Sequence, residues 1–207
     1  MAEIFSLFPC PLYHINRGID LSHKEETDLK NITDNGFISN KYNSICKDTY
    51  VFNNKLEKLK QFCEDHIKIY VENIISPKEE VKFYITQSWI NKTRSNEEHH
   101  LHTHPNSIIS GVFYIRTVEE DKISFGDPNW RIKERVKFQM RTSNTWNTEV
   151  MNINVTKNDL ILFPSWLDHF VPQNPQATTD RISLSFNTFF RGNLGNEDGT
   201  GLQNLNL

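Results

Sequence analysis

Near its midpoint the chain reads Glu98-His99-His100-Leu101-His102-Thr103-His104-Pro105, an octapeptide that holds four of its eight histidines. In an extended strand successive side chains alternate between two faces. We therefore expect His100, His102 and His104 on one face and His99, Leu101 and Thr103 on the other. Neutral imidazole is a common ligand of iron, zinc and copper, so a His-x-His pair offers two ligands at once. The octapeptide predicts a metal site built on a strand.

Two segments near the other end of the chain extend this pattern. An apolar run over 160–163 predicts a buried strand that ends at Pro164, and His169 follows as a candidate third ligand. Twelve residues after His169 an alternating strand begins, with Arg181, Ser183 and Ser185 on one face. A buried arginine requires an anion, and its guanidinium pairs with a carboxylate to which a nearby hydroxyl can also donate. These segments predict a carboxylate-binding site beside the metal.

In their order and spacing these residues resemble the Fe(II)/2-oxoglutarate-dependent oxygenase superfamily, and within it a bacterial and phage group related to prolyl 4-hydroxylases. The motif that carries the resemblance is His102-x-His104, then His169, then Arg181-x-Ser183. The resemblance covers nearly the whole chain. Its other matching segments are 7–13, 88–91, 104–107, 110–114, 125–128, 163–169 and 181–187.

The resemblance implies a dioxygenase that uses Fe(II), 2-oxoglutarate and O2. It would hydroxylate a peptidyl side chain or a small molecule and release succinate and CO2. The catalytic metal would be held by His102, His104 and His169. The far carboxylate of 2-oxoglutarate would pair with Arg181 and accept a hydrogen bond from Ser183. Further candidates for the cofactor pocket, chosen by position, are Asn91, Ser110, Tyr114 and Asn187, with Trp89 and Trp166 beside them.

One position departs from the family pattern. The superfamily has His-x-Asp or His-x-Glu as its first ligand pair, and here His104 stands where the acid is expected. A third imidazole makes the site one charge more positive, which changes iron affinity and redox behaviour. Two other ligand sets stay open. His100 and His102 could form the pair, or an acid such as Glu98 or Asp127 could reach the metal.

Other functions stay open as well. A cupin-type dioxygenase with three histidines would need no 2-oxoglutarate, and it would leave Arg181-x-Ser183 unexplained. A non-catalytic jelly-roll protein could hold zinc in the same site without affinity for 2-oxoglutarate. A nucleic-acid demethylase of the same superfamily is a further variant. The basic and aromatic segment 129–147 is its only support, and the resemblance places that segment at the pocket mouth.

The distribution of apolar residues predicts the fold. Residues 22–25 read as a capping box for a short helix, and apolar residues recur at helical spacing from about 53 to 75. Strand-like runs follow at 82–90, 108–116, 122–125, 136–141, 149–155, 160–163 and 181–190. Helices followed by many strands indicate a mainly β fold with flanking α, a double-stranded β-helix (a jelly-roll or cupin-like barrel) braced by N-terminal helices.

The length predicts a single domain over 1–207, with a helical part to about 80, a barrel core over about 81–191 and a flexible tail over 192–207. The net charge of −3 and the lack of a long basic run disfavour nucleic acid as a partner. Three cysteines without ligand spacing indicate a reduced, cytoplasmic protein, and no apolar run is long enough to span a membrane. The expected partner is a small-molecule or peptide substrate; assembly into a homo-oligomer stays open.

Overall fold

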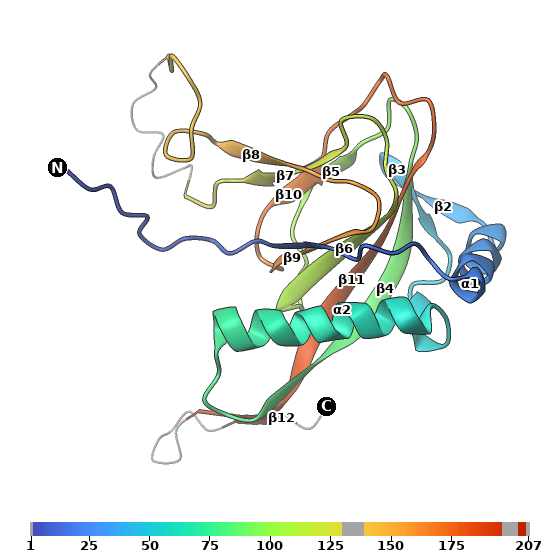
Figure 1. Cartoon of the computed structure of the whole chain (residues 1–207), viewed down its shortest axis with the longest axis horizontal. Coiled ribbons are helices and arrows are strands. Elements are labelled where there is room, and N and C mark those ends of the chain that lie inside the picture. The colour runs from blue at the N-terminus through green and yellow to red at the C-terminus, as the bar shows by residue number, and fades with distance from the viewer. Residues whose placement is uncertain (1, 130–138, 196–202, 206–207) are drawn as a thin grey trace.

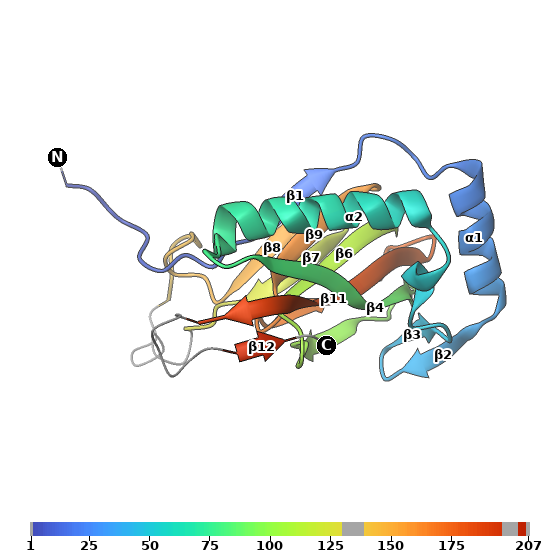
Figure 2. The same ribbon diagram turned by 90° about the horizontal axis from the view of Figure 1, so that it is seen from below.

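The computed structural model describes residues 2–129, 139–195 and 203–205. Two antiparallel sheets face each other and helices cover the outer face of the larger one (Figures 1 and 2). The larger sheet has the strand order β1-β9-β6-β11-β4-β3-β2, with β12 paired to β11, and the smaller has the order β5-β10-β7-β8. The prediction of a mainly β double-stranded β-helix is confirmed.

The strands of the larger sheet are β1 Tyr13–Asn16, β2 Phe37–Asn40, β3 Asn43–Cys46, β4 Val81–Thr93, β6 Ile109–Arg116, β9 Asp159–Pro164, β11 Arg181–Leu194 and β12 Gln203–Leu205. Those of the smaller sheet are β5 His99–His102, β7 Lys122–Gly126, β8 Val150–Asn154 and β10 His169–Val171. The long pairing of β4 with β11 joins the middle of the chain to its C-terminal part.

The helices precede the strands from β4 onward, as predicted, although β1 lies before α1, and β2 and β3 lie between α1 and α2. Helix α1, His23–Asp34, begins with the expected capping box, in which the Ser22 hydroxyl accepts from the Glu25 N–H while the Glu25 carboxylate accepts from the Ser22 N–H. A 3-10 turn, η1 (Val51–Asn53), leads to helix α2, Glu57–Tyr70, which continues as the π-helical turn η2, Val71–Ile75. Helix α2 starts later than predicted because Leu56 has a left-handed backbone with φ of 56°.

The larger sheet buries both of its faces, which explains why β6 and β9 are apolar almost throughout. Helix α2 lies across one face (Figure 2), and Leu59, Cys63 and Ile67 of the helix join a core cluster with Phe113 and Phe186. The opposite face looks toward the smaller sheet. The predicted alternation in β11 is confirmed, because Ile182, Leu184 and Phe186 pack in the helix-side core while Arg181, Ser183 and Ser185 line a cavity between the sheets.

The N-terminal part contains three strands that the sequence did not lead us to expect. Strand β1 pairs with β9, and the β2–β3 hairpin extends the larger sheet beyond β4. Within the segment 192–207, β11 runs on to Leu194 and β12 pairs with it, so the described part of this segment contributes to the larger sheet. The first half of the predicted strand 136–141 falls outside the described residues, and residues 139–141 do not form a strand. Within the described part of the chain, no helix has the length and apolar character needed to cross a membrane.

Candidate metal centre

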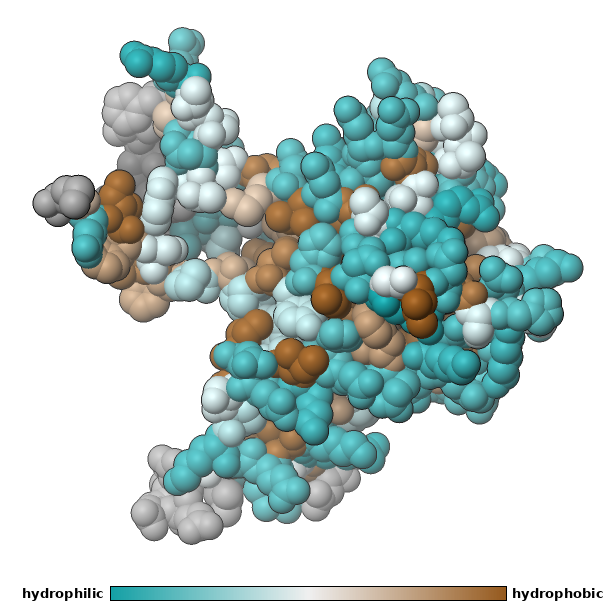
Figure 3. Space-filling view, in the orientation of Figure 1, coloured by the Kyte–Doolittle hydropathy of each residue, from teal (hydrophilic) through white to brown (hydrophobic). Residues whose placement is uncertain are grey.

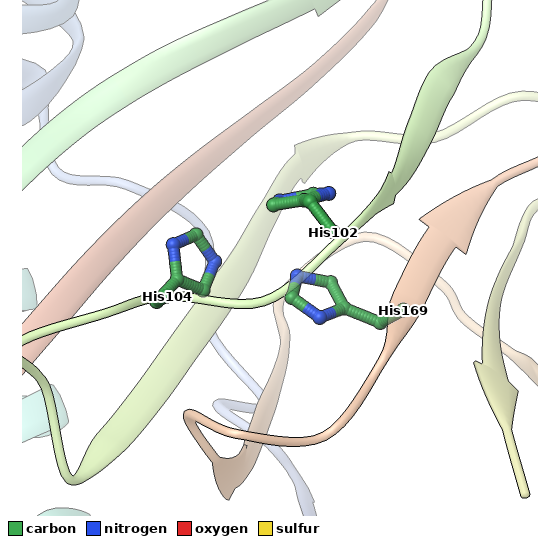
Figure 4. A group of neighbouring side chains, drawn as sticks. All are labelled: His102, His104 and His169. Atoms are coloured by element: carbon green, nitrogen blue, oxygen red, sulfur yellow. The ribbon is translucent and has the colours of Figure 1, made fainter. Parts of the chain in front are cut away.

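Three histidines from two strands and a loop meet between the sheets. His102 ends β5, His169 begins β10, and the two residues are direct partners in the strand pairing. His104 lies two residues past β5, and its N–H donates to the carbonyl of Ser165 at 2.9 Å. One ligand nitrogen from each ring lies within 4.8 Å of the other two, and Figure 4 shows the rings gathered around a common point. The three predicted ligands are therefore brought together.

Backbone carbonyls orient two of the three rings. Nδ1 of His102 lies 2.7 Å from the carbonyl oxygen of His100, and Nδ1 of His169 lies 2.9 Å from that of Leu167. A carbonyl only accepts, so in each ring Nδ1 carries the proton and Nε2 keeps its lone pair for a metal ion. Such hydrogen bonds hold metal-binding imidazoles in both tautomer and orientation.

Burial keeps the triad neutral. Desolvation is the main cause that lowers the pKa of His102, lowers that of His169 well below its usual value and lowers that of His104 to about 4. The aromatic rings of Phe125 and Phe163 pack against His169 and contribute to this burial. Neutral imidazole is the form that binds a metal ion, so the three side chains are ready ligands at neutral pH.

The structure corrects the predicted facing of His99. His169 pairs with His102 and Val171 pairs with His99, so β5 has one more residue than β10 over the same stretch. This β-bulge brings His99 to the side of His102, and their rings stack with centroids 4.4 Å apart. His99 thus lines the cavity of the triad, although strict alternation placed it on the opposite face. Burial lowers its pKa to about 3.

Arg181 lies in the same cavity, at the start of β11, and is buried. Its Nε donates to both carboxylate oxygens of Asp121, at 2.9 and 3.0 Å, and its Nη1 donates to the hydroxyl of Ser183 at 3.1 Å. The guanidinium also lies over the ring of Tyr114, with Cζ 5.0 Å from the centroid. Two of the three guanidinium nitrogens are therefore occupied, and Ser183 accepts where we expected it only to donate.

Around Arg181 three buried polar atoms have no hydrogen-bond partner among the described residues. They are Nη2 of Arg181, the hydroxyl of Tyr114 and the hydroxyl of Thr93. Residue Thr93 of β4 lies directly opposite Arg181 of β11 in the strand register. Buried polar groups are almost always hydrogen-bonded, because leaving one unpaired costs about 1–3 kcal/mol. Three unpaired donors near one guanidinium fit a bound carboxylate. The residues of the site therefore fit both groups that the resemblance implies. The three imidazoles can bind the metal ion, and the donors around Arg181 can bind a carboxylate of 2-oxoglutarate.

The cavity between triad and Arg181 has a volume of about 20 Å³. That is room for little more than one water molecule, so a dicarboxylic acid requires the surrounding side chains to move apart. His99 lines both this cavity and a wider outer groove of about 490 Å³ beside Leu101 and Phe170. Displacement of the His99 ring would join the two spaces.

The other predicted pocket residues divide into two groups. Asn91 and Trp89 line the cavity, and the Asn91 amide donates to Ser185 at 2.9 Å. Ser110 and Asn187 do not line it. They bond to each other at 2.9 Å, and Ser110 also bonds to Ser165, so they support the segment that carries His104.

Trp166 lies outside the cavity and is 59 % exposed. The alternative ligands also fall outside: within the described chain, the cluster of potential metal ligands contains neither His100 nor Glu98 nor Asp127. Nδ1 of His100 is buried without a partner among the described residues, and the centroid of its ring lies 5.1 Å from that of His102 and 6.0 Å from that of Tyr42.

Sequence reasoning missed three residues of the site. Thr93 reaches Arg181 only through the register of β4 against β11, which no local pattern reveals. Asp121 ends the acidic run Glu119-Glu120-Asp121, and nothing in the sequence pairs it with an arginine sixty residues away. His99 depends on the bulge in β5. The positions of Thr93 and His99 depend on how strands pair, and the position of Asp121 depends on a contact between the two sheets. Residue spacing in the sequence reveals neither.

Comparison with known proteins agrees with this geometry. The family model described as "Putative 2OG-Fe(II) oxygenase" matches residues 87–187, a range that contains the three histidines and Arg181. No curated protein sequence matches the chain.

Several solved structures share the fold. A prolyl-4-hydroxylase from Pseudomonas putida has a TM-score of 0.56 at 11% identity, covering 88% of this chain and 93% of its own. A prolyl hydroxylase from Trichoplax adhaerens, in complex with a hypoxia inducible factor peptide, has a TM-score of 0.57 at 16% identity, covering 86% and 83%. The α-ketoglutarate-dependent carbocyclase SnoK from nogalamycin biosynthesis has a TM-score of 0.60 at 13% identity, covering 92% and 85%.

The family model covers residues 87–187, just under half of the chain, and its description indicates an Fe(II)- and 2-oxoglutarate-dependent oxygenase. The double-stranded β-helix and the cluster of three histidines agree with that indication. The match therefore indicates an oxidoreductase whose cofactors are Fe(II) and 2-oxoglutarate.

Proposed function

We propose that the chain is a hydroxylase in which His102, His104 and His169 hold Fe(II) and Arg181 receives the far carboxylate of 2-oxoglutarate. The observation that carries the proposal is the buried Arg181, which lines the cavity of the three histidines and whose Nη2 has no hydrogen-bond acceptor among the described residues. A buried cationic donor without an acceptor is costly, and a carboxylate of the cosubstrate removes that cost. A three-histidine dioxygenase or a zinc protein without 2-oxoglutarate would leave this donor unexplained.

The neighbouring hydroxyls fit the same role. Ser183 accepts from Nη1 of Arg181, so its own O–H is directed elsewhere and can donate to a carboxylate. The unpaired hydroxyls of Tyr114 and Thr93 supply two further donors. We therefore assign Tyr114 and Thr93 to the cosubstrate site with Arg181 and Ser183. Asn91 supports Ser185 at the cavity wall, and Ser110 and Asn187 act at a distance through the loop of His104.

Bound together, Fe(II) and 2-oxoglutarate supply the oxidising chemistry: one atom of O2 enters succinate as CO2 leaves, and the other enters the substrate as a hydroxyl group. The chain contributes neutral imidazole ligands, donors for the cosubstrate and an enclosure. Trp89, Val112, Ile123 and Phe170 line the cavity and exclude water from the reacting groups. Uncharged imidazoles leave the metal one charge more positive than a site with a carboxylate ligand would.

For the substrate we propose a peptidyl side chain or a small molecule. Similar structures include a prolyl hydroxylase with a peptide fragment and an enzyme with the small molecule hygromycin B. From the resemblance we further expect a cytoplasmic enzyme of bacterial or phage origin.

Calorimetric titration of 2-oxoglutarate into the Mn(II)-loaded protein tests the proposal without oxidation. Arg181→Gln should keep Mn(II) and bind 2-oxoglutarate at least tenfold more weakly, because a charge-assisted hydrogen bond is lost. As a control, Arg116→Gln changes an exposed arginine at the end of β6 and should leave affinity unchanged. Equal 2-oxoglutarate affinity in Arg181→Gln and wild type would remove the proposed role of Arg181.

A further inference from the structure

Asp121 makes the closest contact to Arg181, and the proposed function gives it no role. Its carboxylate lies in the segment just before β7, in the smaller sheet, while Arg181 belongs to the larger sheet. Both side chains are buried, at 3 % and 6 % exposure, and Nε of Arg181 lies 2.9 Å from Oδ1 of Asp121. The ion pair therefore crosses the gap between the sheets at the end of the cosubstrate cavity.

The backbone of Asp121 is held at both of its polar groups. Its N–H donates to the carbonyl of Val118 at 3.3 Å, and its carbonyl accepts from the N–H of Val155 at 3.0 Å. These bonds fix the carboxylate relative to the sheet, so it is a rigid partner for the guanidinium. Because Nε and one N–H of Nη1 are occupied, the planar group is held in place, and Nη2 is the guanidinium nitrogen that has no acceptor among the described residues and can donate to an incoming acid.

We propose that Asp121 is a positioning residue that selects Nη2 of Arg181 as the donor for the far carboxylate of the cosubstrate. This inference rests on the proposed function. The Asp121 charge also balances Arg181 when no cosubstrate is bound, which lets the arginine stay in place inside the protein. The preformed geometry spares 2-oxoglutarate the cost of ordering a long side chain.

A buried ion pair that only joins the two sheets would give the same contacts, so the test must separate positioning from stability. The probes are 2-oxoglutarate and 2-oxovalerate, which share a five-carbon 2-oxo acid skeleton and differ in the far carboxylate. Both can chelate the metal through the 1-carboxylate and 2-oxo oxygens, and only the first reaches Arg181. Binding of each acid to the Mn(II)-loaded protein is measured by calorimetry.

Asp121→Ala should weaken 2-oxoglutarate binding at least tenfold and leave 2-oxovalerate binding within twofold of wild type. Asp121→Asn keeps an oxygen that can accept from Nε and should bind 2-oxoglutarate within about threefold of wild type. Asp121 lines a second cavity of about 260 Å³, where water can enter once the carboxylate is removed. If the alanine variant fails to fold, Asp121→Ser takes its place with the same expectation, because its hydroxyl is too short to reach Nε but can hold a water molecule.

Unchanged 2-oxoglutarate affinity in Asp121→Ala, or in its serine replacement, would overturn the inference. So would an equal loss of affinity for both acids, because that result is expected of a purely structural ion pair. The failure of the proposed function looks different: Mn(II)-loaded wild type would then bind 2-oxoglutarate no better than 2-oxovalerate. If Arg181→Gln weakens 2-oxoglutarate binding and Asp121→Ala does not, the positioning role alone is wrong.

Discussion

His169 is the most buried of the three histidines, and its Nδ1 proton is held by the Leu167 carbonyl. Removal of this ring leaves two ligands on one short segment, which is too few for a stable site. His169→Ala should therefore lose Fe(II) or Mn(II) binding, measured as metal retained after dialysis. His23→Ala, an exposed histidine at the start of α1, serves as the control and should retain the metal. Full metal content in His169→Ala would refute the ligand assignment.

The lowered pKa values predict an unusual pH dependence. Burial lowers the pKa of all three imidazoles, that of His104 to about 4, so a metal ion has fewer protons to displace here than at exposed histidines. Mn(II) affinity should change less than threefold between pH 8 and pH 6, measured by calorimetry. Exposed histidines with a pKa near 6.5 would lose affinity steeply over this range. A tenfold fall between pH 7 and pH 6 would contradict the burial argument.

The same shifts set the stability of the metal-free protein. The unfolded chain takes up protons on these histidines near pH 6.5, whereas the folded chain does so only at lower pH. Their contribution to the free energy of unfolding is therefore fully present above pH 6.5 and is lost as the pH falls toward 4. The sequence pattern and the family resemblance together predicted the cluster of three histidines and the buried Arg181. They could not predict the tautomers or the partners His99, Thr93 and Asp121, which depend on register and on a bulge.

The packing of β6 against β11 depends on a residue without a side chain. A Cβ atom added at Gly111 would lie 2.1 Å from Cζ of Phe186, inside the core beneath α2. Gly111→Ala should lower the free energy of unfolding by about 1–3 kcal/mol, measured by urea denaturation, because the ring must leave its place. For comparison, a Cβ at Gly126 would meet Asp168 at 3.4 Å, and Gly126→Ala should cost less than half as much. Equal stability of Gly111→Ala and wild type would contradict the packing described.

Elements were predicted best where they are long. Helix α2 and strands β4, β6, β9 and β11 each carry enough apolar residues to show their period in the sequence. Strands β1, β2, β3 and β12 have three or four residues each and pair with distant segments, so no local signal reveals them. Strand β10 has three residues and was not predicted as a strand. Its first residue, His169, was predicted only as a candidate ligand that follows the strand ending at Pro164.

The candidate metal centre lies between the two sheets. Its ligands belong to the smaller sheet and the loop that leads into the larger one, and the ion pair of Asp121 with Arg181 spans the two sheets at the same cavity. A ligand that binds only the folded chain stabilises it by about 2.7 kcal/mol at a hundredfold excess over its Kd. Mn(II) at that concentration should therefore raise the Tm by several degrees, followed by circular dichroism. Under the same conditions His169→Ala should show no shift, and an equal shift in both proteins would place the metal elsewhere.

The N-terminal segment carries a group of exposed apolar side chains. Ile4, Phe5, Leu7 and Phe8 are exposed on an N-terminal segment that extends away from the barrel beside the β7–β8 hairpin (Figures 1 and 3). Sequence analysis identified this segment only through its resemblance to the family. Its position near the hairpin is a property of the folded chain, since it brings residues 5–12 next to residues 125–129 and 145–153.

The central claim is that one cavity holds Fe(II) on three histidines and 2-oxoglutarate on Arg181. Anaerobic titration of the metal-free protein with Fe(II), then with 2-oxoglutarate, tests it most directly through the visible iron-to-ketoacid charge-transfer band. We predict that the band appears with wild type at one equivalent of Fe(II), disappears in His169→Ala and requires at least tenfold more 2-oxoglutarate in Arg181→Gln. Fe(II) bound by wild type without a band at saturating 2-oxoglutarate would contradict the account.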